Sequence, residues 1–162
     1  MAERRPPRAQ GVSLRDVTKA DVDAFFEHQA DPVAARIAAV PGRDRQAFHA
    51  HWAGVLSNDR VAKKTILVDG EVAGNVVSWE QDGRPLVGYW IGRTYWGRGV
   101  ATSALSQFLQ HVRARPLFAY VATHNLGSIR VLEKCGFAVC GEPERVVDER
   151  GDVHELTMKL DH

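Results

Sequence analysis

A glycine-rich loop between an expected strand and an expected helix is the part of this sequence best suited to chemistry. Residues 88–102 read GYWIGRTYWGRGVAT, in which an apolar strand ends near Ile91 and a helix is expected to begin near Val100. Glycines let backbone N–H groups turn toward one point, and the N-terminal end of a helix adds positive potential there. These residue types therefore predict a pyrophosphate site that needs neither an acidic side chain nor a metal.

The loop lies within a strongly basic part of the chain. Between Gly83 and Leu132 there is no Asp or Glu, and six arginines give this stretch a charge of +6, against +1 for the whole chain. A buried sheet that excludes charge and a surface that faces a phosphorylated ligand both fit this pattern. The near-zero net charge argues against a general nucleic-acid binder, and no apolar run approaches the roughly 20 residues of a membrane span.

Two familiar phosphate-binding motifs fail here at particular residues. Gly92 and Gly97 have the spacing of a Walker A loop, but Arg98 and Gly99 stand where that loop needs its Lys and its Ser or Thr. The run Gly97-Arg98-Gly99 begins like a dinucleotide fingerprint, but Thr102 replaces the third glycine. The acidic residue that the fingerprint requires about 20 positions later is also missing from the acid-free stretch.

A third motif fits. Residues 96–101, WGRGVA, resemble the Q/R-x-x-G-x-G/A loop with which the Gcn5-related N-acetyltransferases (GNAT) hold the pyrophosphate of coenzyme A, with Trp96 at the Q/R position. About 30 residues later, NLGSIRVLEKCGF (125–137) is similar to the N-x-x-S-x-R-V-x-E-K-x-G-F signature of the RimJ/RimL-type branch, which acetylates ribosomal proteins. The resemblance covers roughly Ser13 to Leu160, and the two motifs in this order identify the chain as a suspected member of that branch.

The resemblance implies acetyl-coenzyme A as the co-substrate and no metal. It implies that pantetheine lies between two splayed strands, 86–91 and 117–121, bonded to the backbone around Ile91 and Arg93. Asn125 is expected to bind the pantetheine arm near the thioester. The residues expected at the pyrophosphate are Gly97, Arg98, Gly99, Val100, Ala101 and Thr102.

The implied reaction is direct transfer, in which a neutral amine attacks the thioester while a backbone amide at a β-bulge polarises the carbonyl oxygen. Many relatives protonate the leaving thiolate with a tyrosine where this chain has Leu132. Ser128, one turn earlier, has a hydroxyl able to replace it; the alternative is that Ser128 only caps the helix or contacts the cofactor. Glu80 is the candidate general base, with a solvated hairpin end as the alternative. Tyr89 and Trp90 are expected to pack or to shape the groove rather than to react.

The acceptor is expected to be a primary amine, either a protein N-terminus or a small molecule. Acidic side chains such as Glu27, Asp31 and Asp44 are candidates for attracting it. The rival function is a non-catalytic sensor that binds coenzyme A. We expect no nucleic-acid or membrane partner, and the resemblance allows a homodimer. Two cysteines at positions 135 and 140 fit structural thiols in a reducing compartment, which predicts a cytoplasmic protein.

The elements that position these residues follow from hydrophobic periodicity and turn signals. They predict an α+β fold with a mixed, mostly antiparallel sheet of about seven strands and about four helices, with residues 12–162 as one domain and 1–11 as a flexible arm. Asp31-Pro32 is expected to end the first helix, and residues 150–152 to form the last turn. Strands are predicted at 12–17, 65–68, 72–79, 86–91, 117–121, 137–140 and 153–160, and helices at 20–28, 44–57, 100–112 and 126–135.

Overall fold

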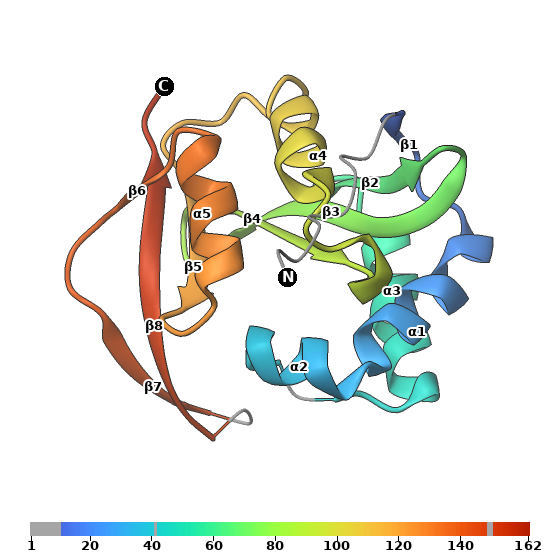
Figure 1. The fold of residues 1–162 in the computed structure, drawn as a ribbon, viewed down its shortest axis with the longest axis horizontal. Coiled ribbons are helices and arrows are strands. Elements are labelled where there is room, and N and C mark those ends of the chain that lie inside the picture. Colours follow the sequence, from blue (N-terminus) through green and yellow to red (C-terminus); the bar gives the residue numbers. More distant parts are fainter. Residues whose placement is uncertain (1–10, 41, 149–150) are drawn as a thin grey trace, which may run out of the picture.

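The computed structural model describes residues 11–40, 42–148 and 151–162, and it shows the predicted mixed α+β architecture (Figure 1). The predicted arm, apart from Gly11, and residue 150 of the predicted last turn lie outside the described residues. The strands are β1 (Val12–Arg15), β2 (Ala62–Val68), β3 (Glu71–Gln81), β4 (Arg84–Ile91), β5 (Leu117–Ala122), β6 (Ala138–Val139), β7 (Glu144–Asp148) and β8 (Gly151–Leu160). The helices are α1 (Val22–Ala30), α2 (Pro32–Ala38), α3 (Arg45–Ser57), α4 (Val100–Phe108) and α5 (Leu126–Lys134), with 3-10 turns η1 (Lys19–Asp21) and η2 (Arg93–Tyr95).

The strands form one sheet in the order β1-β2-β3-β4-β5-β8-β6, with β7 paired to β8. All neighbouring strands are antiparallel except β4 and β5, which the crossover through α4 makes parallel. Strand β3 pairs with the whole of β4, but β4 and β5 share the single pair Leu86↔Phe118. From Val87 to Ile91, β4 therefore diverges from β5, and the predicted splay is confirmed.

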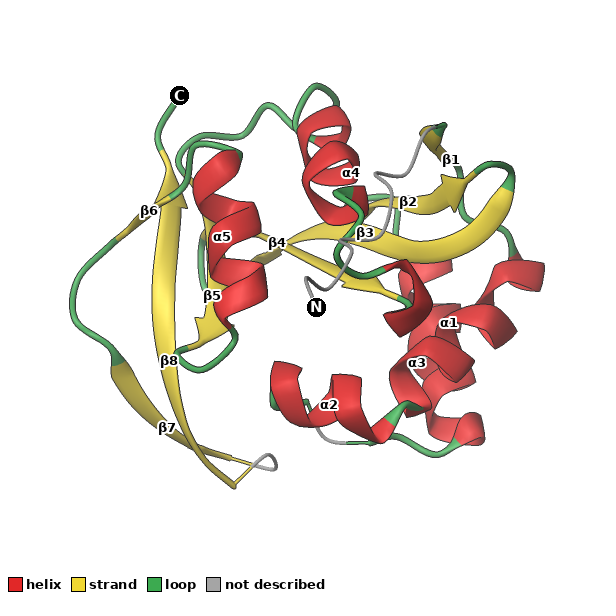
Figure 2. Cartoon of the chain, in the orientation of Figure 1, coloured by secondary structure: helices red, strands yellow, loops and turns green. Residues whose placement is uncertain are grey.

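Helices cover the two faces of the sheet separately. Successive residues of a strand point to opposite faces, and Val76 of β3 packs in the larger core cluster beneath α4 and α5, whereas Val77 packs against a smaller cluster formed by α1 and α3. Figure 2 shows α4 and α5 beside the sheet and α1, α2 and α3 grouped together. In the part of the chain that the structure describes, no helix is long and apolar enough to cross a membrane.

The described residues form five α-helices where about four were predicted, because α2 was not expected. Asp31-Pro32 does end α1, but it also begins α2: the Asp31 carboxylate accepts a hydrogen bond from the Val33 amide at 2.9 Å. Pro32 occupies the first helical position, where a missing N–H costs nothing. The same dipeptide that stops one helix therefore caps the next.

The C-terminal part also differs from the prediction. The strand expected at 137–140 is reduced to β6, paired with Met158 and Lys159 of β8, and the exposed strand β7 was not expected. Strand β7 has few apolar residues and depends on its neighbour, for example through an ion pair between Arg145 Nε and Asp152 Oδ1 at 2.8 Å. Helix α4 ends at Phe108, four residues earlier than predicted.

Candidate functional site

The loop between β4 and α4 forms a cradle of backbone N–H groups. Gly97 and Gly99 have φ values of 72° and 76°, in the left-handed region that favours glycine. Gly99 is the N-cap of α4, and an added Cβ there would have no heavy atom within 4 Å. The residue is therefore needed for its backbone conformation, and the space above it is open to a ligand.

The first turn of α4 has the properties of an anion site. The first helical hydrogen bond runs from the Ser103 amide to the Gly99 carbonyl at 3.1 Å, so the amides of Val100, Ala101 and Thr102 precede it and have no acceptor within the helix. Neither a side-chain cap nor an acidic residue occupies this turn. Within this turn of the described chain, no carboxylate compensates the positive end of the helix.

The open edge of β4 presents backbone groups to the same region. The Gly92 amide donates to the Ala73 carbonyl at 2.8 Å, and alternate residues of an antiparallel strand turn their backbone groups to opposite sides. Tyr89 and Ile91 therefore direct their N–H and C=O groups away from β3, toward the splay. The Ile91 carbonyl accepts a hydrogen bond from Trp96 Nε1 at 2.9 Å.

The β-bulge that the resemblance implies does not lie in β4. Register shifts instead where β2 pairs with β3, between Ile66 and Leu67, whereas β3 and β4 pair without interruption. The amides of Tyr89 and Ile91 in β4 therefore face the splay, and the strand is regular there.

The two arginines of the loop have different surroundings. Arg93 Nε pairs with Asp31 Oδ2 at 2.8 Å, which ties the loop to the start of α2. The Arg98 guanidinium lies 5.8 Å from the centre of the Tyr95 ring. The Arg93 carbonyl accepts a hydrogen bond from the Trp96 amide at 3.1 Å, while the Arg93 side chain contacts the helical part of the molecule.

Asn125 and Ser128 lie at the start of α5. Asn125 is the N-cap, and its Oδ1 accepts a hydrogen bond from the Ser128 amide at 3.3 Å. The cap uses only the Oδ1 atom of Asn125, so the NH₂ group of the same side chain is left to donate to another acceptor. The cap also accounts for the helix start that the sequence predicts.

Ser128 contacts a residue that the sequence analysis placed outside the chemistry. Its Oγ lies 2.7 Å from the Tyr89 hydroxyl, within hydrogen-bond distance across the splay. Burial raises the pKa of Tyr89 to about 12. Leu132 has its side chain in the core, with 2% of its surface exposed. The resemblance drew attention to the missing tyrosine of the helix, and no sequence signal connected Tyr89 to Ser128.

Glu80 is not brought together with these residues. It is exposed near the end of β3, where it pairs with Pro85 of β4. Tyr89 lies four residues further along β4, which is about 13 Å at roughly 3.3 Å per residue. Glu80 therefore lies at the closed end of the splay, where Leu86 pairs with Phe118, whereas Ser128 lies at the open end, where the strands have diverged.

The carboxylates proposed to attract a cationic amine each have a partner. Glu27 Oε1 pairs with Arg45 at 2.8 Å, Asp31 with Arg93, and the Asp44 side chain caps α3 at the Ala47 amide. They stabilise the helical part of the molecule rather than standing free.

His28 is a further residue that the sequence analysis missed. Its ring packs so closely on Gly92 that a Cβ there would lie 2.7 Å from His28 Cδ2, which explains why residue 92 must be glycine. Burial lowers the pKa of His28, and its Nδ1 is buried without a hydrogen-bond partner among the described residues. The same holds for Trp90 Nε1 on β4.

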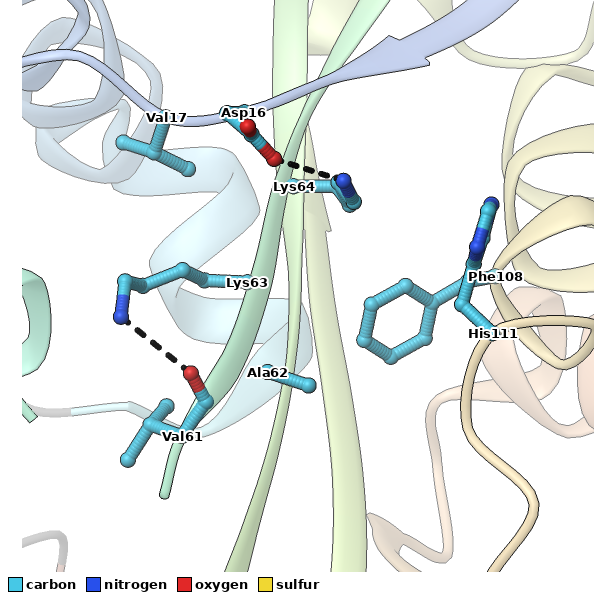
Figure 3. Close-up of a pocket in the computed structure, with 8 residues that line it drawn as sticks. All are labelled: Asp16, Val17, Val61, Ala62, Lys63, Lys64, Phe108 and His111. Carbon is cyan, nitrogen blue, oxygen red and sulfur yellow. Dashed lines mark hydrogen bonds and ion pairs between the residues drawn. The ribbon is translucent and has the colours of Figure 1, made fainter. Parts of the chain in front are cut away.

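A pocket of about 280 Å³ lies away from these residues, beside β2 and the end of α4 (Figure 3). Its lysines are engaged, Lys64 with Asp16 at 2.6 Å and Lys63 with the Val61 carbonyl at 3.3 Å. Among the residues described by the structure, no group of three or more His, Cys, Asp or Glu side chains is placed to hold a metal ion.

Comparisons with known proteins agree with this geometry. The sequence profile described as "Acetyltransferase (GNAT) domain" matches residues 12–138. No curated protein matches the sequence.

Solved structures share the fold at low identity. A GNAT-family acetyltransferase from Bacillus anthracis has a TM-score of 0.80 at 15% identity, covering 96% of this chain and 97% of that chain. RimL, a ribosomal-protein α-N-acetyltransferase in complex with coenzyme A, has a TM-score of 0.78 at 17% identity, with 94% of each chain covered. AAC(6')-Ib in complex with paromomycin and acetyl-coenzyme A has a TM-score of 0.75 at 18% identity, again with 94% of each chain covered.

Proposed function

The chain belongs to the GNAT acetyltransferases, whose co-substrate is acetyl-coenzyme A, and on this premise we propose that it transfers the acetyl group directly to a primary amine. The observation that carries the proposal is the juxtaposition of an uncompensated helix N-terminus at Gly99 with the splay between β4 and β5. The helix N-terminus would bind the pyrophosphate, and the splay would bind pantetheine along the backbone groups of Tyr89 and the amide of Ile91, whose carbonyl already accepts a hydrogen bond from Trp96 Nε1. The N-terminal end of a helix favours negative charge without a metal.

The reaction follows from these placements. The amine nitrogen attacks the thioester carbonyl, and the developing oxyanion is stabilised by a backbone amide of β4 that faces the splay. The C–S bond then breaks and its electron pair stays on sulfur. The nitrogen loses one proton and the sulfur gains one, so the reaction is balanced through water. Ser128 is the side chain that we assign to the departing thiolate.

The acceptor is a protein N-terminus or a small-molecule amine. Among the structures that share this fold, RimL is named as an acetyltransferase of a ribosomal protein, and AAC(6')-Ib was solved with paromomycin. Because Glu27, Asp31 and Asp44 are already paired, we propose that the acceptor enters as the neutral amine and loses its proton to water after attack, without help from these carboxylates.

The test is thiol release from acetyl-coenzyme A across a panel of peptides with free N-termini, aminoglycosides and polyamines, in the presence of EDTA. Stimulated release with at least one amine supports the proposal, and mass spectrometry of that acceptor must show one added acetyl group. If coenzyme A binds in calorimetry but no amine stimulates release, the chain is a binder rather than an enzyme. If coenzyme A fails to bind at millimolar concentration, the whole assignment is overturned.

Replacing Asn125 with alanine is expected to lower kcat/KM by about tenfold, because a hydrogen bond of roughly 1–2 kcal/mol to pantetheine is lost. Alanine also removes the N-cap of α5, which costs about 1 kcal/mol of stability. Asn125→Asp separates the two effects, since the carboxylate keeps the cap and lacks the NH₂ donor. Both variants should lose activity, and only Asn125→Ala should melt at a lower temperature. Full activity in Asn125→Asp would remove this residue from the site.

Replacing Glu80 with glutamine is expected to leave kcat/KM within about twofold of the wild type. The side chain is exposed at the closed end of the splay, and substitutions at such positions usually have small effects. The measurement is the pH dependence of kcat/KM for both proteins with the same amine. A loss of tenfold or more, together with a lost ascending limb, would instead make Glu80 the general base.

A further inference from the structure

We propose that Tyr89 is a positioning residue for the leaving-group step: its hydroxyl orients the Ser128 hydroxyl toward the departing sulfur. Helix α5 has Leu132 where many relatives have a tyrosine. Strand β4 thereby supplies a tyrosine hydroxyl that α5 lacks. This inference rests on the proposed function and adds to it a residue from a different element, for which the sequence held no signal.

The geometry brings the two hydroxyls together from opposite sides of the splay. Tyr89 lies in the part of β4 that has already diverged from β5, beyond the Leu86↔Phe118 pair. Ser128 lies in the first turn of α5, three residues after the N-cap. Their oxygens are 2.7 Å apart, and the tyrosine hydroxyl is also 3.5 Å from the Ser128 carbonyl. Both side chains are partly buried. The bond therefore joins β4 to α5 at the level where the thioester is expected.

Either hydroxyl can donate in this bond, and we assign the donor role to Tyr89. Burial keeps the Tyr89 phenol protonated, since its pKa is raised from 10.0 to about 12. A protonated phenol that donates to Ser128 Oγ leaves the serine O–H free to donate to a third atom. Hydrogen bonds in such a chain polarise one another, which makes the serine a better donor to an anion. As the C–S bond breaks, Ser128 stabilises the thiolate by this hydrogen bond, and the proton that sulfur finally takes comes from water.

The helix itself has no room for the usual tyrosine. Leu132 lies on the same face of α5 as Ser128, one turn further on, but its side chain is fully enclosed in the core. A larger aromatic side chain there would overpack the core. Cys135, on the next turn, is half-buried, and burial raises the pKa of its thiol.

A double-mutant cycle tests the proposal with Tyr89→Phe, Ser128→Ala and the combined variant, using any amine that the wild type acetylates. Tyr89→Phe removes only the hydroxyl, and kcat should fall about three- to tenfold, as expected for one hydrogen bond. The KM for acetyl-coenzyme A and the Kd for coenzyme A should stay within about twofold. In the Ser128→Ala background, Tyr89→Phe should have no further effect on kcat, because the residue acts through Ser128.

The outcomes are separable. Ser106 is exposed on α4, and Ser106→Ala is the control for loss of a hydroxyl, expected to keep full activity. If Tyr89→Phe lowers kcat by the same factor in both backgrounds, its role is structural and the inference is overturned, as it is if Tyr89→Phe has no effect. If the wild type shows no turnover with any amine, the proposed function fails first and the inference falls with it.

Discussion

Replacing Gly99 with aspartate is expected to weaken the binding of coenzyme A by at least about a hundredfold. The new carboxylate would stand at the N-cap of α4, where the structure has open space and where we place the pyrophosphate. At an effective dielectric constant of about 20, two like charges about 4 Å apart repel by about 4 kcal/mol. Each 1.4 kcal/mol is about tenfold in Kd, so even two-thirds of this repulsion gives the expected loss.

The matched control is Gly99→Asn, which has nearly the same shape without the charge. Both Asn and Asp tolerate the left-handed conformation that this position requires, with φ of 76°. Calorimetry with coenzyme A should therefore show a small loss for the asparagine variant and a large one for the aspartate variant. Equal affinities in two folded variants would show that the phosphates bind elsewhere.

Replacing Ser128 with alanine is expected to lower kcat by about ten- to a hundredfold while the Kd for coenzyme A stays nearly unchanged. The effect should stay below the upper end of general acid catalysis, because a thiol has a pKa of about 8.5 and its thiolate already leaves readily. The amide that bonds to Asn125 belongs to the backbone, so alanine keeps the cap of α5. Ser106, exposed on α4, provides the control substitution Ser106→Ala, which should keep full activity.

The pH–rate profile gives a second measure of the same step. Because the pKa of Tyr89 is raised to about 12, the phenol stays protonated through pH 10, and kcat should show no descending limb from tyrosine in that range. The ascending limb should follow the deprotonation of the acceptor amine. A loss of three or more orders of magnitude in Ser128→Ala, with cofactor affinity intact, would contradict this small role and make Ser128 essential for catalysis.

The loop and the helix start that we expect to bind coenzyme A could be predicted from the sequence, because local residue patterns determine them. The glycines at 97 and 99 and the apolar stripe that begins at Val100 specify a loop followed by a helix wherever they occur, and the structure has both. Asn125 was expected at a helix start for the same reason. The acid-free stretch agrees with a helix N-terminus that no carboxylate compensates.

The rest depends on contacts between residues far apart in the sequence. Tyr89 and Ser128 are 39 residues apart, and only the parallel crossover through α4 brings them within 2.7 Å. Arg93 was expected to serve the cofactor through its backbone, but its pairing with Asp31 of the α1–α2 junction has no local signature. Glu80 is predicted as the base because it ends the strand before the acid-free stretch, where a strand end is expected beside the cleft. The register of β3 and β4 instead places it level with the Leu86↔Phe118 pair and away from Ser128.

The single bridge between β4 and β5 has a mechanical consequence. At Leu86 and Phe118 the two halves of the sheet are held by one backbone pair, reinforced by the Arg84 guanidinium 4.7 Å from the centre of the Phe118 ring. Beyond this pair, β4 and β5 share no further backbone pair in the described residues. We therefore expect an extended ligand to enter or leave the splay without local unfolding of the sheet. For the same reason, we expect product release to require no breaking of backbone pairs between β4 and β5 beyond Leu86.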